Sequence, residues 1–118
     1  MLLSDENYFK FQELVKTDTG LDNSPTSPDD LVNLAGLWKY LNYVREKLGK
    51  PIFINSAYRT DAVNKQVKGA KRSYHKSALA SDIRTYPEYM NELREILLED
   101  KSKFKEFIDY KSFFHFAI

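Results

Sequence analysis

NSAYRTDAVNKQVKGAKRSYHKSALASDIR, residues 55–84, is the stretch that organises the rest of the chain, because turn residues, charges and a histidine gather in it. Near its end stands the pattern S-x-H-x-x-A-x-A-x-D, formed by Ser73, His75, Ala78, Ala80 and Asp82. The imidazole of His75 and the carboxylate of Asp82 are seven residues apart, across a loop that enters a predicted strand. Both groups are common metal ligands, so the pattern predicts one side of a metal site.

The second histidine of the chain, His115, lies in the C-terminal run FFHFAI, which alternates as a β-strand does. A catalytic zinc ion commonly takes three histidine or carboxylate ligands and keeps a fourth position open. His75, Asp82 and His115 are therefore the candidate ligands of one zinc ion. Two incidental surface histidines are the alternative, since neither belongs to a self-sufficient local motif such as H-E-x-x-H.

Two strands are predicted on either side of the histidine loop. Residues 51–55, PIFIN, are β-prone and predict a central strand that carries Arg59 to its exit. Residues 79–85 predict a second strand, in which the period of two places Asp82 on the face opposite Ile83. One face of this strand would then coordinate the metal while the other packs into the core.

A long helix is predicted before these strands, with Ser27 as its N-cap, Pro28 at its first position and Gly49 as its stop. Its apolar side chains recur every three or four residues: Leu31, Leu34, Trp38, Leu41, Val44 and Leu48. Such a stripe could line a ligand groove, but we interpret it as the core face and assign Trp38 to the core. Residues 16–28 are rich in turn formers and predict a long surface loop.

A second helix and two strands are predicted after Arg84. Pro87 opens an amphipathic helix that should cover the sheet, and strands over residues 104–110 and 113–118 follow it. Alternation places His115 on the face opposite the core. The order of the elements predicts an α+β fold, a small antiparallel sheet packed by helices.

Length and composition limit the function classes. With 118 residues the chain fits one domain, residues 1–118, to which the N-terminal segment and loop of residues 1–27 belong. A net charge of +1 gives no electrostatic case for a nucleic-acid partner, and we expect a monomer. The lack of cysteine excludes thiolate ligands and a cysteine nucleophile, which leaves nitrogen and oxygen ligands.

The start of the chain shows no targeting segment. Residues 1–3, MLL, are followed at once by the polar residues 4–7, SDEN, so no apolar stretch of signal-peptide length is present. No later run approaches membrane-spanning length. We expect a protein that is made in the cytoplasm without a signal peptide and does not insert into a membrane.

Four motifs stand in order along the chain: SAYRT at residues 56–60, VKGA at 67–70, the histidine pattern at 73–82, and FFHFA at 113–117. They resemble S-G-Y-R-S, V-G-G-A, S-x-H-x-x-G-x-A-x-D and W-x-H-V-S of the zinc D-Ala-D-Ala carboxypeptidases, the LAS metallopeptidases. The resemblance runs from about Phe9 to the C-terminus, and both histidines fall on ligand positions of that family.

The resemblance implies a Hedgehog/DD-peptidase-like fold, with one zinc ion on the three candidate ligands. It also implies cleavage of a peptidoglycan stem peptide next to a D-amino acid, by a carboxypeptidase or an endopeptidase. Arg59 takes the place of the active-site arginine, which stabilises an oxyanion or holds a substrate carboxylate. Ser73 and Tyr58 join it as substrate-binding residues. Stand-alone relatives resemble phage or prophage lysis proteins, which reach the cell wall after the membrane is opened.

The general base is where the chain departs from the family pattern, which has a glutamate a few residues before the last histidine. Tyr110 stands at that position. The adjacent Asp109 is the predicted base, with Glu106 as the alternative if the strand carries a bulge or the turn is shifted. If neither reaches the water, activity would be severely weakened. The alternative to an active peptidase is a catalytically silent family member that acts as a cell-wall peptide-binding or structural module. Ala57 and Ala78 also replace glycines, which bears on loop geometry.

Overall fold

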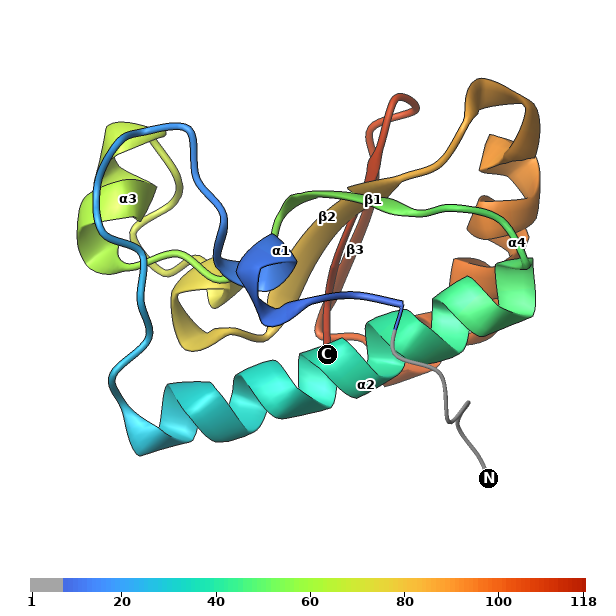
Figure 1. Ribbon diagram of the computed structural model, residues 1–118. Coiled ribbons are helices and arrows are strands. Elements are labelled where there is room, and N and C mark those ends of the chain that lie inside the picture. The colour runs from blue at the N-terminus through green and yellow to red at the C-terminus, as the bar shows by residue number, and fades with distance from the viewer. Residues whose placement is uncertain (1–7) are drawn as a thin grey trace.

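The computed structural model describes residues 8–118, in which helices pack against a four-stranded antiparallel sheet with the strand order β1-β2-β4-β3 (Figure 1). The elements in chain order are α1 (Phe11–Val15), α2 (Pro28–Leu48), β1 (Phe53–Ser56), α3 (Asp61–Gln66), the 3₁₀ turn η1 (Tyr74–Ser77), β2 (Ala80–Arg84), the 3₁₀ turn η2 (Pro87–Tyr89), α4 (Met90–Glu99), the 3₁₀ turn η3 (Lys101–Lys103), β3 (Glu106–Asp109) and β4 (Phe114–Ala117). The predicted α+β class is confirmed. The expectation about a targeting segment concerned residues 1–7, which lie outside the described part.

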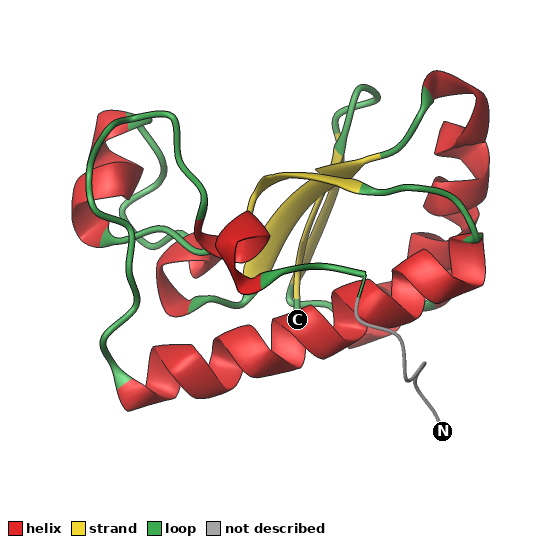
Figure 2. Ribbon diagram, viewed as in Figure 1, coloured by secondary structure: helices red, strands yellow, loops and turns green. Residues whose placement is uncertain are grey.

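The long helix α2 runs along one face of the sheet and meets α4 at its C-terminal end (Figure 2). Its ends agree with the prediction, since the Ser27 hydroxyl accepts a hydrogen bond from the Asp30 amide and Gly49 closes the helix with φ 70°. Its core face comprises Leu34, Leu37, Leu41, Val44 and Leu48. Leu31, predicted to be in the core, is 44% exposed because it borders a surface pocket. None of the helices within residues 8–118 is long and apolar enough to cross a membrane.

The sheet has one apolar face and one face that carries polar side chains. Ile54, Ile83, Phe114 and Phe116 are almost fully buried on the helix-facing side. Asp82 points to the other side, as the alternation in β2 predicts. The prediction of β1 as a central strand is wrong. It is an edge strand, because the C-terminal strand β4 takes the second edge of β2.

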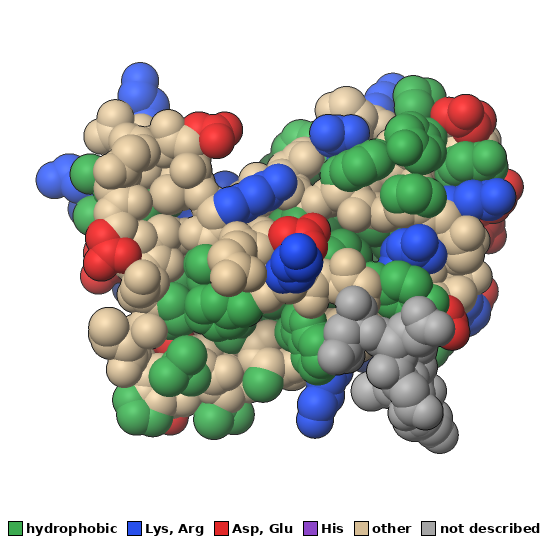
Figure 3. Space-filling model, in the orientation of Figure 1, with side chains coloured by type: hydrophobic (Ala, Val, Ile, Leu, Met, Phe, Trp, Pro, Cys, Tyr) green, Lys and Arg blue, Asp and Glu red, His purple; other side chains and the backbone are tan. Residues whose placement is uncertain are grey.

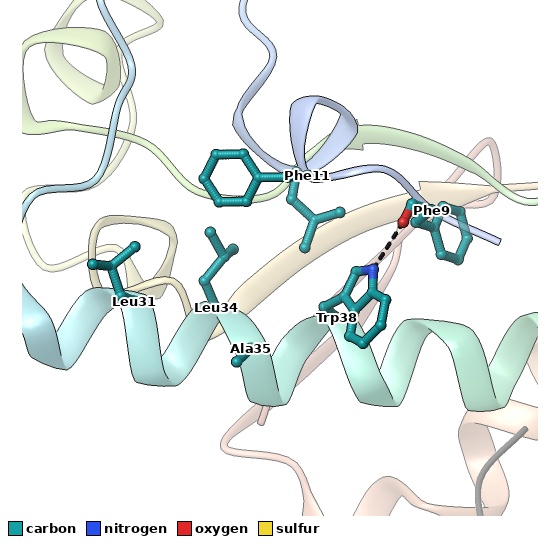
Figure 4. A pocket seen from close by; sticks show the side chains of 7 residues that line it. Phe9, Phe11, Leu31, Leu34, Ala35 and Trp38 are labelled. Atoms are coloured by element: carbon teal, nitrogen blue, oxygen red, sulfur yellow. Dashed lines mark hydrogen bonds between the residues drawn. The ribbon is translucent and has the colours of Figure 1, made fainter. Parts of the chain in front are cut away.

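Trp38 packs against the core but also borders an apolar surface pocket of about 350 Å³ between α1 and α2. Its indole Nε1 donates to the carbonyl oxygen of Phe9 at 2.8 Å (Figure 4). Apolar side chains gather over α1 and the first half of α2 on this face of the molecule (Figure 3). The pocket is lined by Phe9, Phe11, Leu14, Leu31, Leu34, Ala35 and Trp38.

Candidate metal centre

Three side chains from separate parts of the chain converge on the polar face of the sheet: His75 from η1, Asp82 from β2 and His115 from β4. Asp82 and His115 are directly opposite each other on paired strands. Oδ1 of Asp82 lies 2.8 Å from Nδ1 of His115 and 3.2 Å from Nε2 of His75. One ligand atom from each residue lies within 4.8 Å of the other two, so the three could hold one metal ion.

The histidine loop is shaped by its own sequence. Ser73 is the N-cap of η1, where its hydroxyl accepts a hydrogen bond from the His75 amide at 3.2 Å. Ala78 ends the turn with φ 59° and is fully buried. This left-handed conformation explains why the family pattern has glycine there, since an alanine adopts it only with strain. His75 itself is only 3% exposed, so its ring has a fixed position.

Each histidine has its outer ring nitrogen bonded to an acceptor. Nδ1 of His75 lies 2.6 Å from the carbonyl oxygen of Ala57, and Nε2 of His115 lies 2.8 Å from Oε1 of Glu106. Histidines that bind metals commonly donate their second ring N–H to a carbonyl or a carboxylate in this way. Nε2 of His75 and Nδ1 of His115 are the nitrogens that face Asp82. The donor set and its supports therefore fit a metal ion.

The electrostatics of the centre keep Asp82 ionised. Burial alone would raise the pKa of Asp82, but hydrogen bonds from His115 and His75 outweigh it and lower the pKa to about 2. Burial lowers the pKa of His115, while its hydrogen bonds to Asp82 and Glu106 raise that pKa above the usual value. In the metal-free protein the imidazole of His115 thus carries positive charge more readily than a free histidine.

Arg59 lies beside the centre and is fixed by several protein groups. Its Nε donates to the Ser56 hydroxyl at 3.0 Å, its Nη1 donates to Oδ1 of Asn64 at 3.2 Å, and its Nη2 is 3.6 Å from Oδ2 of Asp82. Its backbone N–H donates to the carbonyl of His75 at 3.0 Å. Burial lowers the pKa of Arg59, which the charge of Asp82 opposes. The guanidinium is therefore a positive charge held at a defined place next to the candidate metal ligands.

Asn64 is a residue of this site that no sequence motif indicates, and Gly69 belongs to the VKGA motif but has no role predicted from it. A Cβ atom on Gly69 would lie 2.0 Å from Oδ1 of Asn64, far inside van der Waals contact. The Asn64 carboxamide also donates to the carbonyl of Ala70 at 2.8 Å, which locks its orientation. The glycine of the VKGA motif thus leaves the space for the side chain that holds Arg59. The match of residues 67–70 to the family motif is the sequence feature that indicates this glycine.

The two acidic residues considered as bases lie on opposite faces of β3. Ile108 is the cross-strand partner of His115, and Glu106, two residues away, shares that face and reaches the imidazole. Asp109 points to the helix-facing side, where its Oδ2 accepts a hydrogen bond from Nε of Arg94 at 2.7 Å. The structure brings Glu106 to the centre and does not bring Asp109 there.

A cleft of about 290 Å³ opens over the centre. Of the residues predicted to bind substrate, Arg59 and Ser73 line it, whereas Tyr58 is 6% exposed and packs in the hydrophobic core. Tyr110, at the position where the family has glutamate, also lines the cleft. The full lining consists of Arg59, Ala70, Arg72, Ser73, His75, Asp82, Glu106, Ile108, Tyr110, Phe113 and His115.

Comparison with protein families identifies the chain. A family model described as Peptidase M15 matches residues 7–117. The chain belongs to the peptidase M15 family. The resemblance drawn from the four motifs is thereby confirmed. No curated protein matches the chain.

Peptidase M15 proteins are zinc metallopeptidases that act on peptidoglycan. Two imidazole nitrogens and a carboxylate are ligands that zinc accepts in its catalytic sites. In this M15 chain the same three side chains converge in a cleft, with outer hydrogen bonds that fix both rings. The family and the geometry therefore point to the same cleft.

Proposed function

We propose that the chain is a zinc-dependent peptidase that cleaves peptidoglycan stem peptides next to a D-amino acid, as a carboxypeptidase or an endopeptidase. The observation that supports it is the convergence of His75, Asp82 and His115 in one cleft of an M15 chain. The same resemblance that suggests the substrate also suggests a role in cell-wall cleavage during phage or prophage lysis.

The residues of the cleft have distinct tasks in this proposal. A zinc ion held by His75, Asp82 and His115 would supply a Lewis acid that polarises the scissile carbonyl and lowers the pKa of a water molecule. Arg59, fixed by Ser56 and Asn64, stabilises the negative charge that develops on the carbonyl oxygen of the substrate. Because its position is set before the substrate arrives, little reorganisation is needed during the reaction.

Glu106 takes the role of general base in this proposal, in place of Asp109. One oxygen of its carboxylate accepts from His115, which leaves the second oxygen to accept a proton from the attacking water. The hydrogen bond from Arg94 lowers the pKa of Asp109, which makes that carboxylate a weaker proton acceptor as well as a distant one. The positions of Glu106 and Asp109 on opposite faces of β3 support Glu106 as the base.

A catalytically silent module that binds cell-wall peptides is the second candidate, and one observation favours it. Within the described residues, Asp82 and Glu106 are the only acids that line the cleft, and both are hydrogen-bonded to histidine. If Glu106 serves only to orient His115, the cleft retains its metal without a base. Binding of metal and peptide would then persist without hydrolysis.

The test compares the purified wild type with His75→Ala. Metal content is measured first, and hydrolysis of stem peptides with and without a chelator is measured on the same samples. One zinc ion per wild-type chain, its loss in His75→Ala, and cleavage that the chelator abolishes are the expected results. Zinc binding without cleavage would support the silent module instead of the peptidase. A wild-type chain that binds no metal would contradict both candidates.

A further inference from the structure

Two arginines line the cleft, and they differ in what surrounds them. The guanidinium of Arg59 is engaged by Ser56, Asn64 and Asp82, and its side chain is only 16% exposed. Arg72 is exposed, and no residue in the range 8–118 gives its side chain a hydrogen bond or an ion pair. The donors of Arg72 are thus available to a ligand, whereas those of Arg59 are largely satisfied within the protein.

The backbone under Arg72 is held next to the metal centre. A turn closed by the bond from the Ser73 amide to the Ala70 carbonyl, 3.1 Å long, has Lys71 and Arg72 as its central residues. The same Ser73 caps the turn that carries His75. The base of the arginine side chain is therefore fixed within a few residues of a metal ligand, while its guanidinium can adjust to a bound group.

Besides Glu106, the segment from β3 to β4 gives the cleft apolar side chains. Ile108 and Tyr110 of the β3–β4 hairpin are 41% and 51% exposed, and the Tyr110 ring stacks on Phe113 with the ring centroids 4.7 Å apart. A peptide bound in the cleft would thus meet both the unpaired guanidinium of Arg72 and apolar surface. This combination favours a substrate that carries an anionic group together with small apolar residues.

We propose that Arg72 forms a carboxylate subsite, which makes the substrate a peptide with a free carboxylate near the scissile amide. This inference rests on the proposed function and narrows its substrate class. The guanidinium can bind a carboxylate through two parallel hydrogen bonds, which an uncharged carboxamide cannot match. A stem peptide that carries a terminal carboxylate and one free glutamyl carboxylate offers this chemistry in two places.

The test uses four forms of one stem peptide: both carboxylates free, either one amidated, and both amidated. Cleavage is measured for the zinc-loaded wild type, Arg72→Ala, Arg72→Lys and Lys71→Ala. Lys71→Ala is the matched control, because it removes the same charge from the same turn at a residue that does not line the cleft. The amidated peptide that the wild type cleaves poorly identifies which carboxylate binds.

Arg72→Ala should lower kcat/KM for the free peptide by about 10- to 100-fold, mainly through KM, and remove the preference over the amide. Arg72→Lys should recover part of the loss, because it keeps the charge but not the paired geometry. Lys71→Ala should stay within about threefold of the wild type. Equal losses on acid and amide peptides, or equal effects of the two alanine variants, would overturn the subsite.

Failure of the proposed function has a different signature. If the wild type cleaves none of the four peptides, their binding to the wild type and to Arg72→Ala is measured by calorimetry. Binding that weakens on amidation in the wild type but not in Arg72→Ala supports the subsite in a non-hydrolytic protein. The subsite would be overturned if amidation does not change the affinity of the wild type, or if the wild type binds none of the peptides.

Discussion

The apolar pocket between α1 and α2 and the cleft over His75 have similar volumes, about 350 and 290 Å³, but different contents. The apolar pocket is lined by hydrocarbon and aromatic side chains, and the indole N–H of Trp38 is satisfied by a backbone carbonyl. The cleft gathers two imidazoles, two carboxylates and two guanidinium groups. Pocket volume alone therefore does not indicate a functional site in this molecule, whereas converging polar groups do.

This difference makes the two regions separable by experiment. Changes in the cleft should alter metal binding and hydrolysis. Changes in the apolar pocket should alter the stability of the fold with little effect on metal binding or hydrolysis. The predictions below test that separation.

The largest effect is expected for Asp82→Asn, because Asp82 is hydrogen-bonded to both histidines at the centre. The amide keeps the shape but is a much poorer metal ligand than the carboxylate. Metal content should fall, and hydrolysis should drop by more than about 100-fold, beyond what outer-sphere changes cost. Phe11→Ala is the matched control in the apolar pocket and should keep full metal content. Equal loss of metal in both variants would contradict the separation.

Gly69→Ala should impair hydrolysis without removing the metal. The added Cβ would lie 2.0 Å from Oδ1 of Asn64 and would displace the group that holds Arg59. A shift of about 1 Å in a positioning group can lower the rate by about 100-fold. Gly36→Ala is the control, since nothing lies within 4 Å of a Cβ there. In a helix it should raise stability by about 0.5–1 kcal/mol and leave kcat unchanged.

How far sequence could predict this site is clearest at residues 106–109. Local rules identified α2 from its caps, and they placed Asp82 and Ile83 on opposite faces of β2, because both depend on near neighbours. The face of β3 that meets His115 depends on the register with β4, and a one-residue shift reverses every side chain. The sequence of the turn alone does not reveal that register, and it therefore favours Asp109, the acid nearer to His115, over Glu106.

Contacts between residues that are far apart in the sequence could not be predicted from it either. The carbonyl of Ala57 and the carboxamide of Asn64 support His75 and Arg59 only because separate segments fold together. The edge position of β1 likewise follows from β4 joining the far side of β2 at the end of the chain. The three candidate ligands could be predicted because the motifs preserve their positions, whereas the groups that support them come from other parts of the chain.

Glu106→Ala should weaken zinc binding by about 10- to 100-fold, because it removes the acceptor that orients His115. Glu106→Gln keeps a side-chain oxygen acceptor but no proton-accepting carboxylate, so it should retain most of the affinity and lose activity if Glu106 is the base. Asp109→Ala should change neither quantity. Affinity is measured by competition with a chelator. Full activity in Glu106→Gln would exclude the base role and leave the orienting role.

The stabilisation that zinc provides should increase with pH. The pKa of His115 is raised above 6.5, so its protonated form stabilises the metal-free protein below that pH and the contribution fades as pH rises through the folded value. Metal binding needs the neutral ring. Melting temperatures with and without zinc should therefore differ more at about pH 8 than at about pH 6. In acid, the lowered pKa of Asp82 predicts that the free energy of unfolding decreases as the pH falls from 3.8 to about 2, because the carboxylate becomes protonated. A zinc effect independent of pH would contradict the assignment.

Trp38→Phe should give the smallest effect, and it tests the apolar side of the comparison. The variant loses the hydrogen bond from Nε1 to the Phe9 carbonyl, which should lower the free energy of unfolding by about 1 kcal/mol. Metal content and kcat/KM should not change. The two regions do touch through α1, because Leu14 borders the pocket and its carbonyl accepts a hydrogen bond from the amide of Tyr58, the neighbour of Arg59. A fall in kcat/KM beyond about fivefold, more than the stability loss alone accounts for, would show that this bond transmits packing changes to the guanidinium and that the regions are coupled.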